Sequence, residues 1–219
     1  MNIKSIKSEI LSLSLVILSV LSFKSVIACN YTVPTGSMRS TIEIGDKIIV
    51  NKMAYDFRIP FTKIKLFEIS QPKRGDIIVF ESPRDPSMTL VKRLIGLPGD
   101  RIDVYNGMIR LNGKPLQLTE IDSKGIQSVL NDGGFYQESL EGKNYKVRRT
   151  SRKQFPLPPQ SFTVPADHYF AMGDNRDESS DGRHWGFFPA ENLWGQAKFV
   201  YFSADWPQIR WDRTGLKLI

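Results

Sequence analysis

The stretch from residue 75 to residue 100, GDIIVFESPRDPSMTLVKRLIGLPGD, contains the pattern that decides the fold. At Gly75 and again at Gly99, a Gly-Asp pair precedes a run rich in β-branched residues, and the same pair opens GDKIIVN at Gly45. Glycine supplies the turn, and the β-branched run fits a pleated, half-buried surface. The pattern therefore predicts a mostly β fold built from successive turn-and-strand units.

The middle of the chain differs from the segments on either side of it. The dipeptides Asn106-Gly107 and Asn112-Gly113 favour tight hairpin turns, and residues 106–162 are polar and turn-rich, with NDGG, EGKN and PLPP. Strand-like runs such as HYFAMGD and AKFVYFS follow this region. We therefore expect an inserted β-ribbon lobe at 106–162 between two parts of one core, 29–105 and 163–219.

The N-terminus carries the one long apolar run. Residues 10–28, ILSLSLVILSVLSFKSVIA, would span about 28 Å as a helix, close to the ~30 Å hydrocarbon core of a bilayer. Lys4 and Lys7 precede the run, which favours a cytoplasmic tail at residues 1–9. The pattern predicts a single transmembrane anchor with the rest of the chain on the extracytoplasmic side.

Two alternatives remain open for this segment. It could be a cleaved secretory signal, or VIAC, which resembles a bacterial lipoprotein box, could leave Cys29 lipidated at a new N-terminus. Lys24 within the apolar run argues against both, because the apolar regions of such signals are normally uncharged. All three interpretations deliver the remaining chain to the same side of the membrane.

Composition excludes several functional classes. The net charge is +7, but the basic residues form no motif interleaved with aromatic residues. We therefore expect a solvated basic surface and no nucleic-acid partner. The single cysteine excludes an internal disulfide. No Cys, His and carboxylate cluster has the spacing of metal ligands, so the sequence predicts neither a metal nor an organic cofactor.

Ser37, in VPTGSMRSTI just after the apolar run, is a candidate nucleophile that needs a base to remove its proton. The two histidines, His168 and His184, lie more than a hundred residues away, and we interpret His184 as a surface or packing residue. Lys92 shares its strand face with leucines two residues away on either side. Loss of water there would lower its pKa towards neutrality, although a strand lysine can also extend to solvent.

Three sequence motifs together resemble those of a known family. PTGSM followed by a Gly-Asp strand, then VKRLIGLPGD, then GDNRDESSDGRHWGFFP at Gly173–Pro189 resemble the type I signal peptidases in content and order. These are serine proteases, anchored in the bacterial inner membrane, that remove signal peptides from exported preproteins on the periplasmic side. The resemblance implies an antiparallel β catalytic core with an inserted β-ribbon lobe and one N-terminal transmembrane helix.

The resemblance also assigns roles by motif. Ser37 would be the nucleophile of an acyl-enzyme mechanism, Lys92 the general base, and Ser179 the hydroxyl that orients the lysine amine. Thr35, where the family often has serine, and the N–H of Ser37 would form the oxyanion hole. The remaining motif residues would support the site, with Asp181 and Arg183 as an ion pair: Gly173, Asp174, Asn175, Arg176, Asp177, Asp181 and Arg183.

The implied substrate is an extended preprotein segment with small residues before the cut, and the implied surroundings are a lipid bilayer and a monomeric enzyme. Met38, Ile48 and Leu94 are candidate neighbours of the substrate pocket. Alternatives are a specialised conjugation or pilin-maturation peptidase, an inactive anchored β-domain that binds peptides, and a LexA-like autoproteolytic regulator. The predicted anchor and the lack of a helix-turn-helix signal argue against the last.

Overall fold

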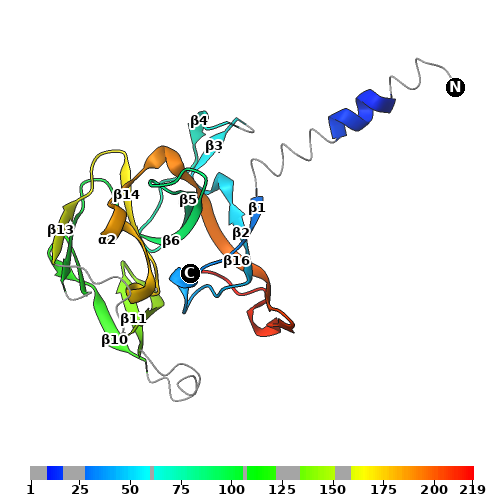
Figure 1. Cartoon of the computed structure of the whole chain (residues 1–219). Coiled ribbons are helices and arrows are strands. Elements are labelled where there is room, and N and C mark those ends of the chain that lie inside the picture. Colours follow the sequence, from blue (N-terminus) through cyan, green and yellow to red (C-terminus); the bar gives the residue numbers. More distant parts are fainter. Residues whose placement is uncertain (1–8, 17–27, 60–61, 106–107, 122–133, 151–158) are drawn as a thin grey trace.

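The computed structural model describes residues 9–16, 28–59, 62–105, 108–121, 134–150 and 159–219. Its main body is an eight-stranded antiparallel sheet in the order β1-β2-β16-β5-β6-β14-β15, with β17 paired to the far end of β16 (Figure 1). The strands are β1 (Ala28–Thr32), β2 (Asp46–Asn51), β5 (Ile77–Glu81), β6 (Thr89–Gly96), β14 (His168–Met172), β15 (Phe188–Pro189), β16 (Leu193–Asp205) and β17 (Gln208–Ile209). The predicted mostly β, antiparallel class is confirmed.

Each Gly-Asp pair closes a turn before a strand, as the sequence predicted. Gly45, Gly75 and Gly99 have φ between +82° and +86°, a region that favours glycine. The aspartate after each glycine accepts a hydrogen bond from the backbone N–H three residues earlier, at 2.7–3.0 Å. Side-chain capping of this kind holds the turn closed while the next residues enter the sheet.

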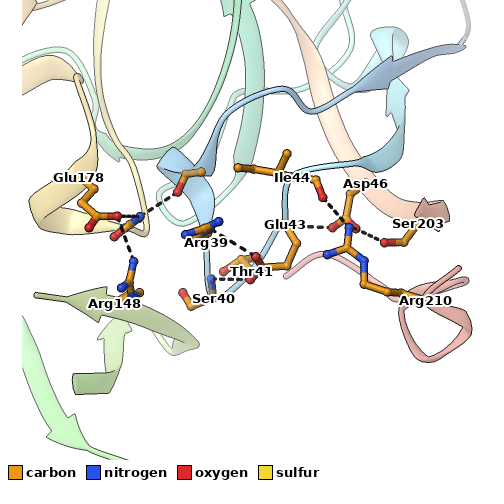
Figure 2. A network of polar contacts seen from close by, with 12 residues as sticks. Arg39, Ser40, Thr41, Glu43, Ile44, Asp46, Arg148, Glu178, Ser203 and Arg210 are labelled. Atoms are coloured by element: carbon orange, nitrogen blue, oxygen red, sulfur yellow. Dashed lines mark hydrogen bonds and ion pairs between the residues drawn. The ribbon is translucent and has the colours of Figure 1, made fainter. Parts of the chain in front are cut away.

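The same aspartates also join distant segments through ion pairs, which the sequence pattern does not reveal. The three pairs are Asp46 with Arg213, Asp76 with Lys143 and Asp100 with Arg74, each at 2.6–2.7 Å. Figure 2 shows the first of these turns, where Asp46 also accepts a hydrogen bond from the hydroxyl of Ser203 on β16. A local turn thus becomes a long-range link.

At β5, the main sheet is buried on both faces. Along β5, Ile77 and Val79 pack into one apolar cluster with β2 and β16, whereas Ile78 and Phe80 pack into a second cluster with β6, β14 and β15. Successive side chains of a strand point to opposite faces, so a continuous apolar run such as IIVF fits a strand covered on both sides. β5 and the second half of its neighbour β6 therefore lie in the buried centre of the sheet.

The lobe strands form two smaller sheets beside β6 and β14 (Figure 1). One has the order β13-β7-β8-β9 and the other β10-β11-β12, with β7 (Arg101–Tyr105), β8 (Met108–Leu111), β9 (Lys114–Pro115), β10 (Gln117–Glu120), β11 (Gly134–Leu140), β12 (Lys143–Arg149) and β13 (Gln160–Thr163). These sheets begin at residue 101, before the expected start of the lobe at 106.

The second predicted hairpin turn is confirmed and the first lies partly outside the described residues. Asn112 and Gly113 both have positive φ, 51° and 78°, between β8 and β9, as a tight hairpin turn requires. Tyr105 pairs with Met108 across the first hairpin, whose central residues 106–107 are not described.

A short hairpin and brief helical turns complete the described fold. The hairpin pairs β3 (Asp56–Arg58) with β4 (Lys65–Glu68). The turns are η1 (Gly36–Met38), η2 (Lys52–Ala54), η3 (Arg176–Glu178), α2 (Gly182–Trp185), η4 (Ala190–Asn192) and η5 (Trp211–Arg213). Residues 9–16 are helical, and no described helix has both the length and the apolar character needed to cross a bilayer. Most of the predicted span, 17–27, lies outside the described residues, so the anchor stays a prediction.

Candidate active site

Ser37 lies in η1, the turn that follows β1. Met38 is fully buried in the apolar core and fixes the turn, while Thr35 before it is exposed in an extended conformation (φ −125°, ψ 152°). Ser37 between them is half-buried. The turn therefore presents the Ser37 hydroxyl at the boundary between core and solvent.

Lys92 lies in the middle of β6, opposite Ile78 of β5. Only 3% of it is exposed, and Leu94 on the same strand face is fully buried. Its Nζ hydrogen-bonds the Oγ of Ser37, 55 residues away in the chain. Among the described carboxylates, none forms an ion pair with this amine. The strand therefore delivers a buried amine to the serine hydroxyl.

The surroundings of Lys92 favour its neutral form. Burial lowers the pKa of the amine to about 8, against a smaller raising effect of the charges on Asp181 and Asp174 and a smaller lowering effect of Arg183. With a pKa of about 8, roughly a tenth of the molecules carry a neutral Lys92 at pH 7. A neutral amine in contact with a hydroxyl can act as its base.

Ser179 lies against the same turn and is fully buried. A Cβ added to Gly173 would overlap the side chain of Ser179 and the carbonyl oxygen of Ser37, so glycine allows these groups to approach. Ser179 Oγ has no hydrogen-bond partner among the described residues, and its expected bond to the Lys92 amine is not made in this structure.

Asp181 and Arg183 form the ion pair that the motif implied. The guanidinium donates through Nε and Nη2 to the two carboxylate oxygens, each at 2.8 Å, and the N–H of Gly173 also donates to Asp181 at 2.9 Å. Burial alone would raise the pKa of Asp181, but the charge and hydrogen bonds of Arg183 hold it below its usual range. Arg183 also donates to the carbonyl of Arg176, which ties the whole loop together.

The two histidines occupy structural positions. His184 lies in α2, where its Nδ1 faces Asp181, and burial lowers the pKa of its imidazole. The ring of His168, at the start of β14, lies 2.8 Å from the carbonyl oxygen of Ala166. In the described part of the chain, the side chain that hydrogen-bonds Ser37 Oγ is Lys92 and not a histidine.

A layer of buried ion pairs lies next to the serine and lysine. Arg93 donates to both oxygens of Asp174 at 2.8 and 2.7 Å, and Thr41, three residues after the turn, donates to Asp174 at 2.6 Å. Arg176 donates through both terminal nitrogens to Glu138 of β11. The layer joins β6, the loop after β14 and the lobe.

The other motif residues also reach the turn or the lobe. Asn175 donates its backbone N–H to the carbonyl of Ser37 at 3.1 Å, and Asp177 accepts the N–H of Thr150 at 2.9 Å. The proposed pocket residues Met38, Ile48 and Leu94 are fully buried under the sheet surfaces. The structure therefore brings the three motif blocks to one place.

The family model described as "Signal peptidase, peptidase S26" matches residues 6–202. The chain belongs to this family. It is a serine peptidase that acts in signal-peptide removal, and family membership sets aside the LexA-like alternative.

Several relatives are similar over most of their length. A "Signal peptidase I" of Pseudomonas fluorescens is 36% identical, over 88% of this chain and 70% of the relative. A "Signal peptidase I" of Rickettsia typhi is also 36% identical, over 99% of this chain and 86% of the relative. The crystal structure of a signal peptidase I from Enterococcus faecalis V583 is 30% identical, with a TM-score of 0.36, and the match covers 58% of this chain and 97% of that one.

Sequence reasoning missed four residues that surround the site of this signal peptidase: Thr41, Arg93, Glu138 and Tyr145. Arg93 carried a usable signal, because a charged residue beside Lys92 in an otherwise apolar strand must find a partner if it is buried. Glu138 carried none, since it stands between the polar residues Gln137 and Ser139 and only the fold shows that this carboxylate is fully buried.

Proposed function

We propose that this signal peptidase cuts its substrates with Ser37 as the nucleophile and Lys92 as the general base. The observation that carries the proposal is the hydrogen bond between a half-buried serine hydroxyl and a buried lysine amine that forms no ion pair with any described carboxylate. Ser37 Oγ adds to the scissile carbonyl carbon while its proton passes to the neutral Nζ of Lys92. The lowered pKa of Lys92 supports this role, because an ammonium cannot accept the proton.

The breakdown of the tetrahedral intermediate reverses the direction of proton transfer. The protonated Lys92 gives its proton to the leaving nitrogen, the C–N bond breaks, and the signal peptide remains as an ester of Ser37. Lys92, neutral again, removes a proton from the water that attacks the ester. As the ester C–O bond breaks, Lys92 passes this proton to Ser37 Oγ, and the signal peptide leaves with a new carboxyl group. One base therefore serves both halves of the reaction.

Two donors stabilise the oxyanion in this proposal, the N–H of Ser37 and the hydroxyl of Thr35. Thr35 is exposed beside the nucleophile, and its side chain does not cap the turn that it precedes. Its hydroxyl is thus available to the substrate. A threonine hydroxyl donates the same hydrogen bond as the serine often found at this position in the family.

Ser179 is proposed to orient the lysine amine once substrate occupies the Ser37 hydroxyl. Its Oγ is buried, has no partner in the described part of the chain, and lies beside Gly173 and the carbonyl of Ser37. A buried hydroxyl without a partner is unfavourable, so a bond to the amine during turnover would satisfy it. Asp174, Arg176, Asp177, Asp181 and Arg183 would hold this loop through their ion pairs and backbone contacts.

The finer placement of the enzyme is also proposed. Residues 10–28 would anchor a monomer by a single span in the inner membrane, with the core parts 29–105 and 163–219 and the lobe on the periplasmic side. The β3–β4 hairpin supports contact with lipid, because Ile64, Leu66 and Phe67 expose more than half of their surface there and Lys63 and Lys65 lie among them. The substrate would enter as an extended segment with small residues before the cut.

Incubation of the detergent-solubilised full chain with a secretory preprotein tests the proposal, with the products read by mass. The expected result is one cut after a small-x-small sequence that the Ser37→Ala variant does not make. Cleavage of a single pilin-type precursor but not of general preproteins would indicate the specialised alternative. Cleavage that persists in Ser37→Ala would overturn the assignment of the nucleophile.

A further inference from the structure

The peptide bond between Gly36 and Ser37 carries the backbone donor of the proposed oxyanion hole. A trans peptide is planar, so its C=O and N–H point in opposite directions. The orientation of the Gly36 carbonyl therefore fixes the direction of the Ser37 N–H. Gly36 has no side chain to restrict rotation of this plane, so hydrogen bonds to its carbonyl restrain the plane directly.

Asn175 supplies such a restraint from the loop after β14. Its Nδ2 donates to the carbonyl oxygen of Gly36 at 2.9 Å, in addition to the bond of 3.0 Å from Arg39 N–H within the turn itself. The backbone N–H of Asn175 donates to the carbonyl oxygen of Ser37 at 3.1 Å. One residue thus holds the two consecutive peptide planes on either side of the Ser37 Cα.

The orientation of the Asn175 amide follows from its partners. Nδ2 donates to Glu178 Oε2 at 3.0 Å as well as to Gly36, and both partners are acceptors, so the NH₂ group and not the oxygen must face them. Glu178 is held in turn by Arg148 of β12 at 3.0 Å (Figure 2). Asn175 itself is 1% exposed, so these bonds form away from competing water.

We propose that Asn175 is a positioning residue for the oxyanion donor: it aims the Ser37 N–H at the substrate oxygen by holding the Gly36–Ser37 peptide from its carbonyl side. This inference rests on the proposed function of Ser37. Asn175 touches neither Lys92 nor the substrate carbonyl in this role, and it differs from a residue that merely builds its own turn. Its contribution appears as charge develops on the substrate oxygen, and therefore in kcat.

The alternative is a structural role in which Asn175 only stabilises η3 through Glu178. Glu178→Ala separates the two, because it removes the second acceptor of Asn175 and leaves the bond to Gly36 in place. If Asn175 acts through Gly36, Glu178→Ala keeps nearly all of kcat. If Asn175 acts through η3, Glu178→Ala and Asn175→Ala reduce kcat equally.

The experiment measures steady-state kinetics of the full chain in detergent on one signal-peptide substrate. Asn175→Ala should lower kcat by about 10-fold to 100-fold with KM within about twofold, because the donor remains but is misdirected. Asn175→Asp keeps the size of the side chain and turns a lone-pair oxygen towards the Gly36 carbonyl, so it should lose at least as much. This variant carries the test if Asn175→Ala does not fold.

A peptide aldehyde provides the readout that a structural role would not move. Ser37 Oγ adds to the aldehyde carbon, and the resulting hemiacetal oxygen occupies the oxyanion position. In the Asn175 variants, the inhibition constant of the aldehyde should therefore rise in parallel with the loss in kcat. Binding of the uncleavable peptide amide should not change. An unchanged aldehyde constant, a kcat near that of the unsubstituted enzyme in both Asn175 variants, or an equal loss in Glu178→Ala would each overturn the inference. Absence of Ser37-dependent cleavage in the unsubstituted chain would instead remove the proposed function on which it rests.

Discussion

Lys92 and its neighbours Arg93, Arg176 and Arg183 are all cations buried to at least 94%, but their partners differ. Each arginine donates two hydrogen bonds to a carboxylate: Arg93 to Asp174, Arg176 to Glu138, and Arg183 to Asp181. In the described part of the chain, the Lys92 amine instead hydrogen-bonds a neutral hydroxyl, that of Ser37. The site therefore has two regions, the pair of Lys92 and Ser37 and the layer of arginine–carboxylate ion pairs. The cations of both regions are buried, and the regions differ in the partner of the cation.

The difference in partner determines the charge state. Burial alone would lower the pKa of Arg93, but Asp174 raises it above its ordinary value, so the guanidinium stays charged. Burial of Lys92 is opposed only by more distant carboxylates, and its pKa falls to about 8. Burial with a carboxylate partner gives a permanent cation at Arg93, whereas burial without one gives a titratable base at Lys92.

The two regions are adjacent on one strand. Consecutive residues of β6 point to opposite faces of the sheet, so Lys92 reaches Ser37 while Arg93 lies over the ring of Tyr145 in the lobe, 3.7 Å from its centre. The ion-pair layer fixes the strand and the loop of Ser179 without placing a carboxylate on the amine. Pairing Lys92 in the same way would hold it protonated and inactive as a base.

The largest expected effect comes from removing the unpaired amine. Lys92→Ala and Ser37→Ala should each lower turnover by about 10³-fold or more, and the double variant should add little, because the two act as a unit. Lys92→Arg should be equally inactive, since a guanidinium does not deprotonate at physiological pH. Steady-state rates on a signal-peptide substrate measure this, and appreciable activity of Lys92→Arg would break the comparison.

Removal of the Thr35 hydroxyl, a neutral donor at the exposed edge of the site, should have the next largest effect. Thr35→Val keeps the branched shape but deletes the hydroxyl, and it should lower kcat by about 10²–10³ with little change in KM. Thr35→Ser should retain most of the rate. If Thr35 only shapes the turn, Val should replace it without loss and Ser could be worse.

On the paired side, Arg93→Met should destabilise the fold by about 3–5 kcal/mol, because it leaves the fully buried carboxylate of Asp174 without its cation. Urea unfolding of the full chain in detergent measures the change in free energy of unfolding. A change below about 1 kcal/mol, the typical contribution of an exposed pair, would show that the layer is not the rigid support described above.

On the unpaired side, Lys92→Met should stabilise the fold at pH 7, by at most about 3 kcal/mol for a pKa lowered from 10.5 to about 8. Below pH 8 the lysine is protonated in both states, so the folded state bears the desolvation of its charge. Above 10.5 it is neutral in both. The gain from Met should therefore shrink as pH rises from 8 to 10.5, and unfolding free energies across this range measure it. A loss of stability at pH 7 that does not change with pH would count against a buried, uncompensated ammonium.

The sequence predicted the elements that depend on local chemistry. The Gly-Asp turns and the Asn112-Gly113 hairpin needed only the preferences of a few adjacent residues. The start of the lobe could not be predicted in this way, because β7 follows a Gly-Asp turn like the core strands do, and its pairing with the distant strand β13 becomes visible only in three dimensions.

The same distinction between local and long-range features applies to the site. Local pattern placed Lys92 on an apolar strand face, but it could not decide between a solvent-reaching lysine and a base; the family motifs made that choice. The carboxylate partners lie 81 residues from Arg93 and 38 from Arg176. Separations of this size leave no periodic signal, so the sequence alone could not show which cations would be paired.

The pH dependence of kcat/KM is the most direct test of Lys92 as the general base, since it reports the pKa values of essential groups in the free enzyme. The measurement compares the full chain in detergent with a variant in which both His168 and His184 are replaced by glutamine. If Lys92 is the base, the rate should rise with pH through an apparent midpoint near 8 in both proteins, as Lys92 loses its proton. A midpoint near the ordinary histidine value of about 6.5 that disappears in the folded double variant would contradict it.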